Sequence, residues 1–388
     1  MRRIEMPREA KKIIDKLYAE GYEAYIVGGC VRDNLIGRVP DDYDVTTSAP
    51  PLEIKRIFEK TLDTGIKHGT VTVIENGKPY EVTTFRVDGE YKDNRHPVSI
   101  SFTGNIKDDL ARRDFTINAL AYNDRIGIVD AFSGIDDIKN NLIRCVRDPE
   151  ERFSEDALRV LRGIRFSSVL EFDIEKSTAD AIVKYADNLR NVSSERIFVE
   201  WKKLLSGKGA YDVICKYKSV IDVFAPELKN INMPPRDSFC NLSWDEREIL
   251  LFSLANSPLS FSEFAKRIKM DSKTRDMGIS VLKTIDELSS GVDPRVFVIG
   301  KSDEVSLKSS KIAATLGICD KKIECDIVKL IESNAPRKVS QLNINGNDLA
   351  ALGIKGEMIG KTLNEALSLV ATSKLSNDKE EIVKYFSK

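Results

Sequence analysis

Histidine is scarce in this chain of 388 residues, which has only His68 and His96. Two histidines are too few for a His-Asp metal phosphohydrolase module, and they make histidine-based acid–base catalysis a poor expectation. The six cysteines form no C-x-x-C pair. This pattern argues against a disulfide framework and against a zinc site.

Long apolar runs, internal repeats and low-complexity tracts are also absent, and no run approaches the roughly 18 residues that a membrane span requires. The start, Met1–Pro7, lacks the apolar stretch of a secretory signal and leads into an amphipathic helical pattern between Ala10 and Leu17. We therefore expect a cytoplasmic protein without membrane association. Because the net charge is only −1, any RNA contact must come from local basic patches.

The chain is long enough for two to four compact units. Residues 22–130 alternate short apolar runs with turns, which predicts a mixed α/β head with one sheet. Strands are expected at 25–27, 42–45, 70–74, 80–85, 100–102 and 126–129, with helices near 31–36 and 51–60. From about Asp137 amphipathic segments of helical length dominate, so the fold class is α+β with an almost wholly helical remainder. The expected helices are 155–168, 175–189, 195–206, 209–218, 244–255, 260–269, 272–291, 303–316, 320–333, 346–352 and 358–373.

Two glycines and two aspartates form the most informative stretch. The apolar run 25–27 is followed by Gly28 and Gly29, which let the backbone approach a ligand closely, and by a helix whose N–H groups can face an anion. Asp42 and Asp44 lie two apart, so on a strand both carboxylates point to one side and favour a divalent cation between them, most readily Mg²⁺. Either feature alone is usually only a turn or a loop. Together they suggest metal-assisted phosphoryl or nucleotidyl transfer.

Gly28 to Asp33 and Asp42 to Thr47 resemble the signature GG-x-VRD-x-L-x-G…D-x-D-x-x-T of the polymerase-β-like nucleotidyltransferase superfamily. The resemblance is strongest to class II tRNA nucleotidyltransferases, the branch that contains CCA-adding enzymes and bacterial poly(A) polymerases. It implies that Asp42 and Asp44 are catalytic metal ligands. It also implies that Gly28, Gly29, Arg32 and Asp33 bind the nucleotide.

A third carboxylate from a neighbouring strand would complete the catalytic set. Glu81 is the best candidate, because the segment from Tyr80 resembles the family strand E-V-T-T-F-R. The alternative is a strand glutamate that faces solvent.

The segment Arg112–Ala121 resembles the family motif R-R-D-F-T-x-N-A. Arg112 and Arg113 precede an expected helix and could bind triphosphate oxygens, since guanidinium groups match phosphate geometry. Asp114 could cap that helix or contact the ligand. Asn118 could tie the segment together or meet a ribose hydroxyl.

The segment 153–166 predicts one helix with Ser154 as N-cap and a charged face opposite an apolar one. Asp156 and Arg159 would be neighbours on its surface, either as a structural ion pair or as a donor–acceptor pair that reads a base edge. The segment resembles the family motif E-D-x-x-R, the protein template that selects CTP and ATP. The resemblance implies that Glu155 orients Arg159.

The same resemblance assigns phosphate contacts to Arg162 and Arg165. The segment Ser194–Leu205 matches a further family motif and is expected to be a helix that supports the template.

Arg86–Pro97 is polar and contains glycine and proline, as expected for a surface loop. It also resembles the flexible family loop R-x-D-G-x-Y-x-D-x-R-x-P, which helps the pocket switch from CTP to ATP and which enzymes that add only CC tend to lack. Near the C-terminus, Lys355, Gly356 and Lys361 surround an expected helix start that could bind RNA phosphates or merely form a packing turn.

The resemblance divides the chain into a nucleotidyltransferase head (1–138), a helical neck with the template helix (139–206), a helical body (207–300) and a helical, tRNA-binding tail (301–388). It implies Mg²⁺-dependent, template-independent addition of CMP, CMP and AMP to the tRNA 3′ end, with CTP and ATP as substrates. The partner is tRNA, at its 3′ end and elbow, and not DNA, while the oligomeric state stays open.

Other family activities remain alternatives to CCA addition. An A-adding enzyme is the nearest, because its motifs and loop can be identical. A bacterial poly(A) polymerase usually has a more basic C-terminal extension, and a CC-adding enzyme tends to lack the loop. An inactive RNA-binding protein fits least, because both metal aspartates, the base-selecting pair and the phosphate arginines are present.

Overall fold

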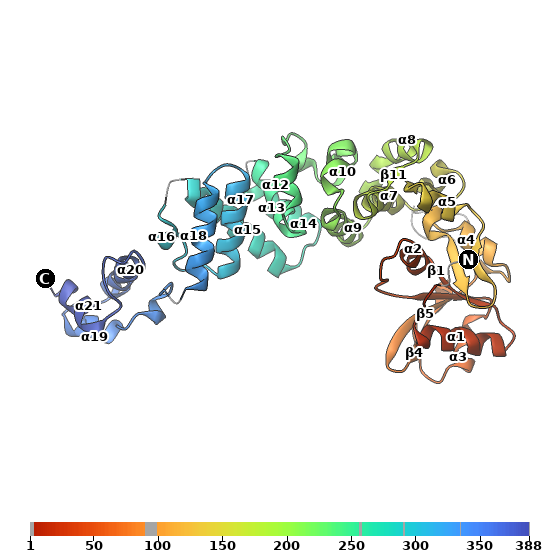
Figure 1. The fold of residues 1–388 in the computed structure, drawn as a ribbon, viewed down its shortest axis with the longest axis horizontal. Coiled ribbons are helices and arrows are strands. Elements are labelled where there is room, and N and C mark those ends of the chain that lie inside the picture. The colour runs from red at the N-terminus through yellow and green to blue at the C-terminus, as the bar shows by residue number, and fades with distance from the viewer. Residues whose placement is uncertain (1–3, 90–98, 256–257, 290–291, 334, 388) are drawn as a thin grey trace. The chain divides into compact units, whose positions relative to one another are not determined.

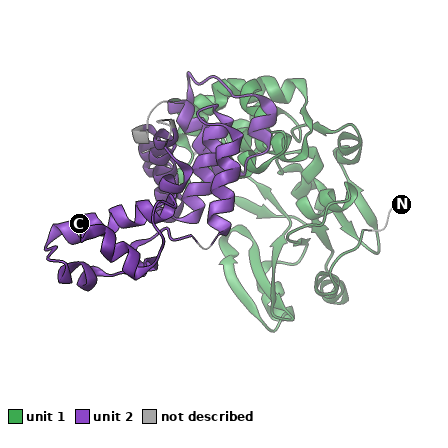
Figure 2. Cartoon of the chain, turned by 60° about the vertical axis from the view of Figure 1, so that its left-hand side comes forward, with its two compact units in different colours: residues 1–226 green, residues 227–388 purple. Residues whose placement is uncertain are grey.

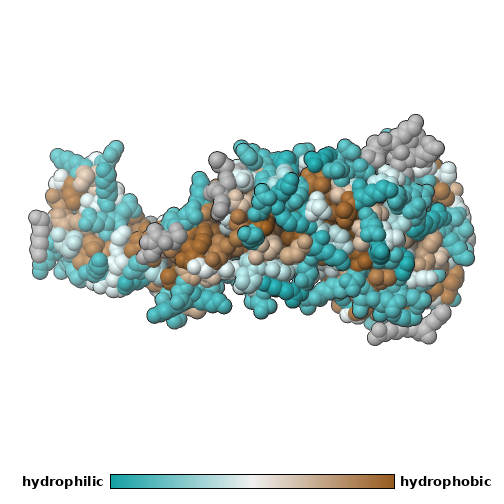
Figure 3. Space-filling view, turned by 90° about the horizontal axis from the view of Figure 1, so that it is seen from above, coloured by the Kyte–Doolittle hydropathy of each residue, from teal (hydrophilic) through white to brown (hydrophobic). Residues whose placement is uncertain are grey.

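The computed structural model describes residues 4–89, 99–255, 258–289, 292–333 and 335–387 (Figure 1). The chain forms two compact units, residues 1–226 and 227–388 (Figure 2). Among the described residues, no helix combines the length and the apolar character needed to cross a membrane. On the face drawn in Figure 3, hydrophilic residues are widespread, with apolar residues between them.

A seven-stranded mixed sheet organises unit 1, with strand order β3-β4-β5-β2-β1-β8-β9. Its strands are β1 (Ala24–Val27), β2 (Asp44–Thr47), β3 (Thr61–Gly65), β4 (Thr70–Glu75), β5 (Lys78–Thr84), β8 (Leu120–Asn123) and β9 (Gly127–Asp130). The β2–β5 pair is parallel and the other pairs are antiparallel. β1 is buried at all four residues, as expected for a central strand covered on both faces.

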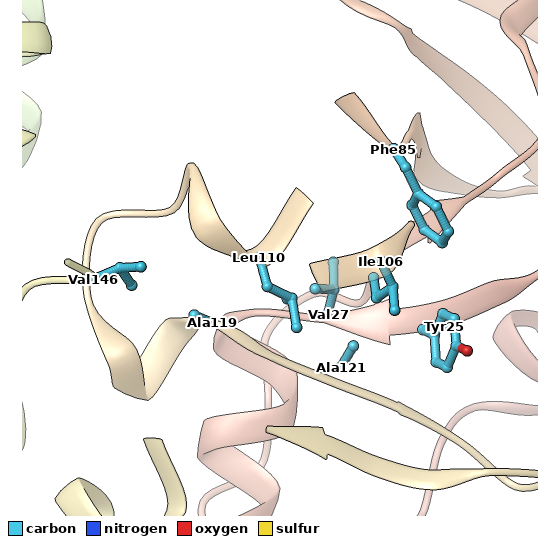
Figure 4. Close-up of a cluster of buried hydrophobic side chains, with 8 residues drawn as sticks. All are labelled: Tyr25, Val27, Phe85, Ile106, Leu110, Ala119, Ala121 and Val146. Carbon is cyan, nitrogen blue, oxygen red and sulfur yellow. The ribbon is translucent and has the colours of Figure 1, made fainter. Parts of the chain in front are cut away.

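Helices α1 (Arg8–Ala19) and α3 (Pro51–Ile57) pack side by side along the sheet (Figure 1). Helix α4 (Ile106–Ala111) packs against β1 and β8 through Ile106 and Leu110, whose side chains point toward the strand residue Val27 (Figure 4). The remaining short elements near the sheet are α2 (Gly29–Leu35), α5 (Gly134–Lys139), η1 (Ile66–His68) and η2 (Thr116–Asn118). The apolar contacts of α4 fix the helix from which the segment 112–118 continues.

Two pairs of short strands accompany the large sheet, so the prediction of a single sheet was incomplete. β6 (Arg86–Asp88) and β7 (Ile100–Phe102) form an antiparallel hairpin. Residues 90–98 lie outside the described residues, and with them most of the expected loop Arg86–Pro97. β10 (Leu142–Ile143) pairs in parallel with β11 (Asp173–Ile174).

Helices complete unit 1 after residue 148. They are α6 (Pro149–Glu155), α7 (Leu158–Leu170), α8 (Lys176–Lys184), η3 (Ala186–Asn191), α9 (Ser194–Ser206), α10 (Ala210–Lys216) and α11 (Lys218–Phe224). α7 and α9 pack closely, and a Cβ atom at Gly207 would lie 2.2 Å from Oγ of Ser168. Only glycine fits this approach of the chain after α9 to α7.

Unit 2 is helical in its described part. After η4 (Pro226–Leu228), which spans the boundary, its elements are α12 (Arg236–Cys240), α13 (Trp244–Leu254), α14 (Pro258–Arg267), α15 (Ser272–Ser289), α16 (Pro294–Phe297), α17 (Asp303–Thr315), α18 (Lys321–Glu332), η5 (Val339–Gln341), α19 (Gly346–Ala351), α20 (Glu357–Ala371) and α21 (Lys379–Phe386). A separate apolar cluster around Leu349, Leu367 and Ile382 holds the last three helices together.

Several expected elements differ from the structure. β3, β8, α4 and α5 were not expected. The expected helix 209–218 corresponds to α10, and α11 follows it as a further helix that was not expected. The helix expected after Arg113 is wrong, because a 3₁₀ turn and β8 occupy that segment. The single helix 155–168 is also wrong, because α6 ends at Glu155 and α7 begins at Leu158.

Candidate active site

Gly28 forms a turn that only glycine tolerates, between the end of β1 and the start of α2. Its φ is +83°, in the region that side-chain-bearing residues rarely adopt. A Cβ atom at this position would lie 3.0 Å from Nη1 of Arg113. The guanidinium of Arg113 therefore lies against the glycine turn.

The two aspartates lie beside this turn, but not on one strand. Asp44 is the first residue of β2 and pairs with Val27. Asp42 precedes β2, so the expected strand 42–45 begins two residues too early. The parallel register of Val45 with Val82 places Glu81 beside Asp44. All three carboxylates line one cavity of about 720 Å³ and are exposed.

The carboxylates influence one another electrostatically. Partial desolvation and the negative charges of Asp42 and Glu81 raise the pKa of Asp44 to about 6, although the positive charge of Arg113 opposes the shift. A cation bound here would relieve this repulsion. In the described part of the chain, no group of three or more Asp, Glu, His or Cys side chains is arranged to hold a metal ion. An ion at Asp42 and Asp44 would therefore need water or substrate oxygens as further ligands, which suits Mg²⁺.

Asp109 on α4 holds the adjacent arginines of the second motif. Its carboxylate is fully buried. Oδ1 accepts hydrogen bonds from Nε and Nη2 of Arg112, at 2.9 and 2.7 Å. Oδ2 lies 3.4 Å from Nη2 of Arg113 and 3.3 Å from the hydroxyl of Thr46, a residue of β2. Burial alone would raise the pKa of Asp109, but the positive charges of the arginines outweigh it and lower the pKa.

Arg113 retains donors that the protein does not use. Its Nε is buried without a hydrogen-bond partner within the described chain. Nε of Arg152 and Nη1 of Arg196 are buried without a partner in the same way, so the position of the Arg113 guanidinium against the glycine turn is the more specific observation. Arg112 is more fully engaged, because its side chain binds Asp109 and its carbonyl oxygen accepts from Nη2 of Arg159.

Asp114 is buried and does not cap a helix. Its Oδ1 accepts from the backbone N–H of Phe115 at 2.8 Å and from Nδ2 of Asn118 at 3.1 Å, and its Oδ2 accepts from Nε of Arg162 at 2.8 Å. The backbone pairs instead with residues 144–146, through Thr116 N–H to Arg144 and Val146 N–H to Asp114. This long-range pairing, together with the local side-chain bond, explains why no helix forms here.

Asn118 links α2 to this segment. Its Oδ1 accepts a hydrogen bond from Nη1 of Arg32, and its Nδ2 donates to Asp114. Arg32 is itself held by Asp33, whose Oδ1 lies 3.0 Å from Nε of Arg32. The geometry supports the tying role for Asn118, and a ribose contact stays a prediction.

The expected template helix breaks at Asp156, which has an extended backbone with φ −135° and ψ 103°. Its Oδ1 accepts from the backbone N–H of Leu158 and so starts α7, as a short carboxylate at a helix N-terminus does. Its Oδ2 accepts from Nη2 of Arg196 at 2.9 Å. Ser154 lies inside α6 and donates to the carbonyl of Glu151, so its expected capping role is wrong.

Arg159 and Glu155 make the contact that the motif implied. Nη1 of Arg159 donates to Oε2 of Glu155 at 2.6 Å, although the two residues belong to different helices. Asp156 is not an i,i+3 neighbour of Arg159 on one helix, because Asp156 precedes α7. The base-selecting role of Asp156 and Arg159 stays a prediction.

Arg162 and Arg165 meet carboxylates of the protein. Arg165 is buried, and its Nε donates to Glu200 of α9 at 2.8 Å. Arg162 binds Asp114 and lies 3.5 Å from Glu200. The ring of Phe166 packs against both guanidinium groups. Its centroid lies 3.5 Å from the guanidinium carbon of Arg165 and 5.3 Å from that of Arg162. These contacts favour a positioning role, and a phosphate contact of either arginine stays a prediction.

Lys355 and Gly356 are exposed before α20, and Lys361 is exposed within it. They belong to unit 2, and their RNA-binding role stays a prediction.

Sequence reasoning missed four residues that hold this site: Thr46, Asp109, Arg196 and Glu200. The last two lie in the segment expected to support the template, so the motif gave a general signal for them. Asp109 and Thr46 gave none, because their contacts depend on how α4 packs on the sheet.

Asp114→Asn should destabilise unit 1 by about 3 kcal/mol at pH 7, because it removes the nearer of the two buried carboxylates that pair with Arg162. Burial alone would raise the pKa of Asp114, but Arg162 and Asn118 lower it below its ordinary value of 3.8. A carboxylate whose pKa is lowered by folding stabilises the folded state above about pH 4. This stabilisation is lost as the pH falls further and the carboxylate is protonated. The difference between Asp114→Asn and the parent protein should therefore shrink below pH 4.

Urea unfolding measures this difference, with the fluorescence of Trp201 reporting unit 1 in a Trp244→Phe background. Asp136→Asn is the control, since Asp136 is an exposed carboxylate in the same unit. An Asp114→Asn penalty no larger than that of Asp136→Asn would contradict the assignment.

Two family models match the chain: the Poly A polymerase head domain over residues 24–144, and the probable RNA and SrmB-binding site of polymerase A over residues 171–232. The CCA-adding enzyme of Lactobacillus helveticus is 35% identical over 391 residues, which cover 97% of this chain and 96% of the relative. The CCA-adding enzyme of Ligilactobacillus salivarius is 36% identical with the same coverage.

Solved structures agree with these relatives. The Bacillus stearothermophilus CCA-adding enzyme in complex with CTP has a TM-score of 0.79 and 31% identity, covering 98% of this chain and 97% of that one. The Thermotoga maritima CCA-adding enzyme complexed with tRNA shares the fold, with a TM-score of 0.71 at 24% identity and coverage of 97% and 93%. Since similarity above 30% identity extends over nearly the whole chain, this chain belongs to the CCA-adding enzymes, a family of tRNA nucleotidyltransferases.

Proposed function

We propose that unit 1 holds a single nucleotide site, at which the chain adds CMP, CMP and AMP in turn to the 3′ end of tRNA. The observation that carries this proposal is the position of Arg113. Its guanidinium lies against the Gly28 turn, influences Asp44 and keeps a buried donor unpaired. A triphosphate beside the turn would meet the Arg113 guanidinium, whose Nη1 lies at Gly28, and would also reach the carboxylates.

Asp42 and Asp44 would hold Mg²⁺, with Glu81 close enough to add negative charge. The donor set fits, because Mg²⁺ is commonly bound by one or two carboxylates together with substrate phosphates and water. When bound, Mg²⁺ supplies charge neutralisation for the α-phosphate and the leaving pyrophosphate. In the reaction the tRNA 3′-hydroxyl forms a bond to the α-phosphorus while the α–β phosphoanhydride bond breaks.

The protein side chains bind and orient the nucleotide. Arg113 and Arg112 would hold the triphosphate, while Gly28 and Gly29 admit it close to the backbone. Arg32 and Asp33 support the turn through Asn118. No protein nucleophile is needed, because the tRNA hydroxyl attacks directly.

Base selection would occur at the junction of α6 and α7. Asp156 offers a carboxylate acceptor and Arg159 a guanidinium donor, groups that can read the different edges of cytosine and adenine. Arg196 holds Asp156, and Glu155 holds Arg159. The two selecting groups are thus anchored from different helices.

We also propose that the chain divides into head, neck, body and tail. In the tail, Lys355, Gly356 and Lys361 would bind tRNA. Their exposure at α20 leaves these residues accessible to a phosphate backbone. The proposed cellular location is the cytoplasm.

With Mg²⁺, CTP and ATP, the purified chain should extend a tRNA that lacks its CCA end by three nucleotides and then stop. Gel analysis of the tRNA 3′ end measures this, with tRNA ending in CC as the second substrate. Extension of tRNA-CC alone would indicate an A-adding enzyme, and arrest after two residues a CC-adding one. A long A tail would contradict the tRNA assignment.

Asp42→Ala and Asp44→Ala should each lower the rate of every addition by at least about a thousandfold, since the metal supplies several kcal/mol of transition-state stabilisation. Asp41→Ala is the matched control, because Asp41 is exposed and lines the same cavity without belonging to the motif. Mn²⁺ binding followed by electron paramagnetic resonance should weaken in the two variants and not in the control. Normal Mn²⁺ binding by both variants would refute the metal role.

Asp156→Ala and Arg159→Ala should reduce the preference for CTP and ATP over UTP and GTP by roughly tenfold to a hundredfold, the range for loss of a bidentate base contact. Mn²⁺ binding at Asp42 and Asp44 should stay intact. Misincorporation is measured with each nucleotide alone, and thermal unfolding checks the fold. Ser154→Ala, an exposed neighbour, is the control; selectivity as high in the variants as in this control would remove both residues from base selection.

A further inference from the structure

Asp109 occupies an unusual position for a carboxylate. It is completely buried, yet its partners are the two arginines of the proposed triphosphate site and a hydroxyl on the strand of Asp44. Burying a carboxylate costs several kcal/mol, and apolar residues often replace buried ion pairs without loss of stability. Stability alone is therefore a weak reason for a charge at this point.

The hydrogen-bonding capacity of this carboxylate is divided between three partners. Oδ1 accepts two hydrogen bonds from Arg112, while Oδ2 faces Arg113 and Thr46. The contacts of Oδ1 are the shorter ones, and the single hydroxyl proton of Thr46 also faces the carbonyl oxygen of Thr83 at 3.1 Å. The negative charge of Asp109 also offsets the repulsion between the two adjacent guanidiniums.

The three partners lead to different parts of the site. Thr46 lies two residues after Asp44 on β2. Arg113 reaches the Gly28 turn. Arg112 accepts a hydrogen bond from Arg159 at its carbonyl and lies 4.0 Å from Asp88 of the β6–β7 hairpin.

Asp109 is itself held rigidly. Its neighbours on α4, Ile106 and Leu110, pack into the apolar cluster on β1 and β8 (Figure 4). A charge fixed by such a core can set the direction of flexible arginine side chains before a ligand arrives.

We propose that Asp109 is a positioning residue for nucleotidyl transfer, which aligns Arg112 and Arg113 with the strand that bears Asp44 so that both can grip the triphosphate of any incoming nucleotide. This inference rests on the proposed function, because it takes the triphosphate as the ligand of the two arginines. Asp109 touches no reacting atom. Its effect on binding is independent of the base.

Asp109→Asn tests the proposal, because the amide keeps the size of the side chain but replaces one acceptor oxygen by a donor that faces other donors. We expect the dissociation constants of CTP, ATP and inorganic pyrophosphate to rise by a common factor of about ten to a hundred. The KM for tRNA and the preference for CTP over UTP should not change. Asp108→Asn is the matched control, since Asp108 is the adjacent carboxylate on α4 and accepts a hydrogen bond from Thr103.

A double-mutant cycle separates positioning from a general structural effect. In an Arg112→Ala/Arg113→Ala background, Asp109→Asn should add no further loss of pyrophosphate binding, because Asp109 acts through those arginines. Thr46→Val, which keeps the carboxylate and removes one partner, should give a smaller loss in the same direction. It also provides the test if Asp109→Asn fails to fold.

Pyrophosphate binding that is unchanged in Asp109→Asn, or in Thr46→Val when Asp109→Asn does not fold, would overturn the inference. So would a loss of equal size in the arginine-free background, or a loss that differs between CTP and ATP. If the parent chain extends tRNA normally in the same experiments, the proposed function survives and only the role of Asp109 fails. If the parent chain neither extends tRNA nor binds pyrophosphate, both proposals fail.

Discussion

The carboxylate of Asp114 is the group on which the rest of unit 1 depends, because it joins the sheet region to α7. One oxygen fixes the turn at Phe115 and Asn118, and the other binds Arg162. Through Asn118 the same network reaches Arg32 on α2. The nucleotide turn and the helix proposed to read the base therefore share one buried acceptor.

Arginine is abundant around this acceptor, and several guanidiniums are matched by buried acids. Asp109 forms an ion pair with Arg112, and Glu200 forms one with Arg165. This matching explains how a chain of net charge −1 can contain a strongly basic site. Matched arginines are restricted in direction, so a ligand would meet guanidiniums that already point one way.

The sequence allowed the local features of the site to be predicted and left the long-range ones hidden. The Gly28 turn and the start of β2 follow from neighbouring residues, so their prediction was close. The helix after Arg113 was wrong, because that backbone pairs with residues 144–146, which no local pattern shows. The unbroken helix 155–168 was wrong because the side chain of Asp156 starts a second helix. Asp109 escaped notice because its partners are brought together only by the packing of α4.

The triphosphate arginines and the carboxylate of Asp156 are held by different side chains, although Arg159 bonds to the carbonyl of Arg112 and so links the two regions. This arrangement bears on how one pocket can accept two nucleotides. Arg112 and Arg113 are held from Asp109 on α4, whereas Asp156 is held from Arg196 on α9. A common triphosphate grip needs a fixed anchor, because CTP and ATP are identical in that part. Base selection needs groups that can change partners, and the extended backbone of Asp156 between α6 and α7 permits this more readily than a position inside a helix. Substitutions around Asp109 should therefore alter the affinity for any nucleotide. Substitutions around Asp156 should alter the choice between nucleotides.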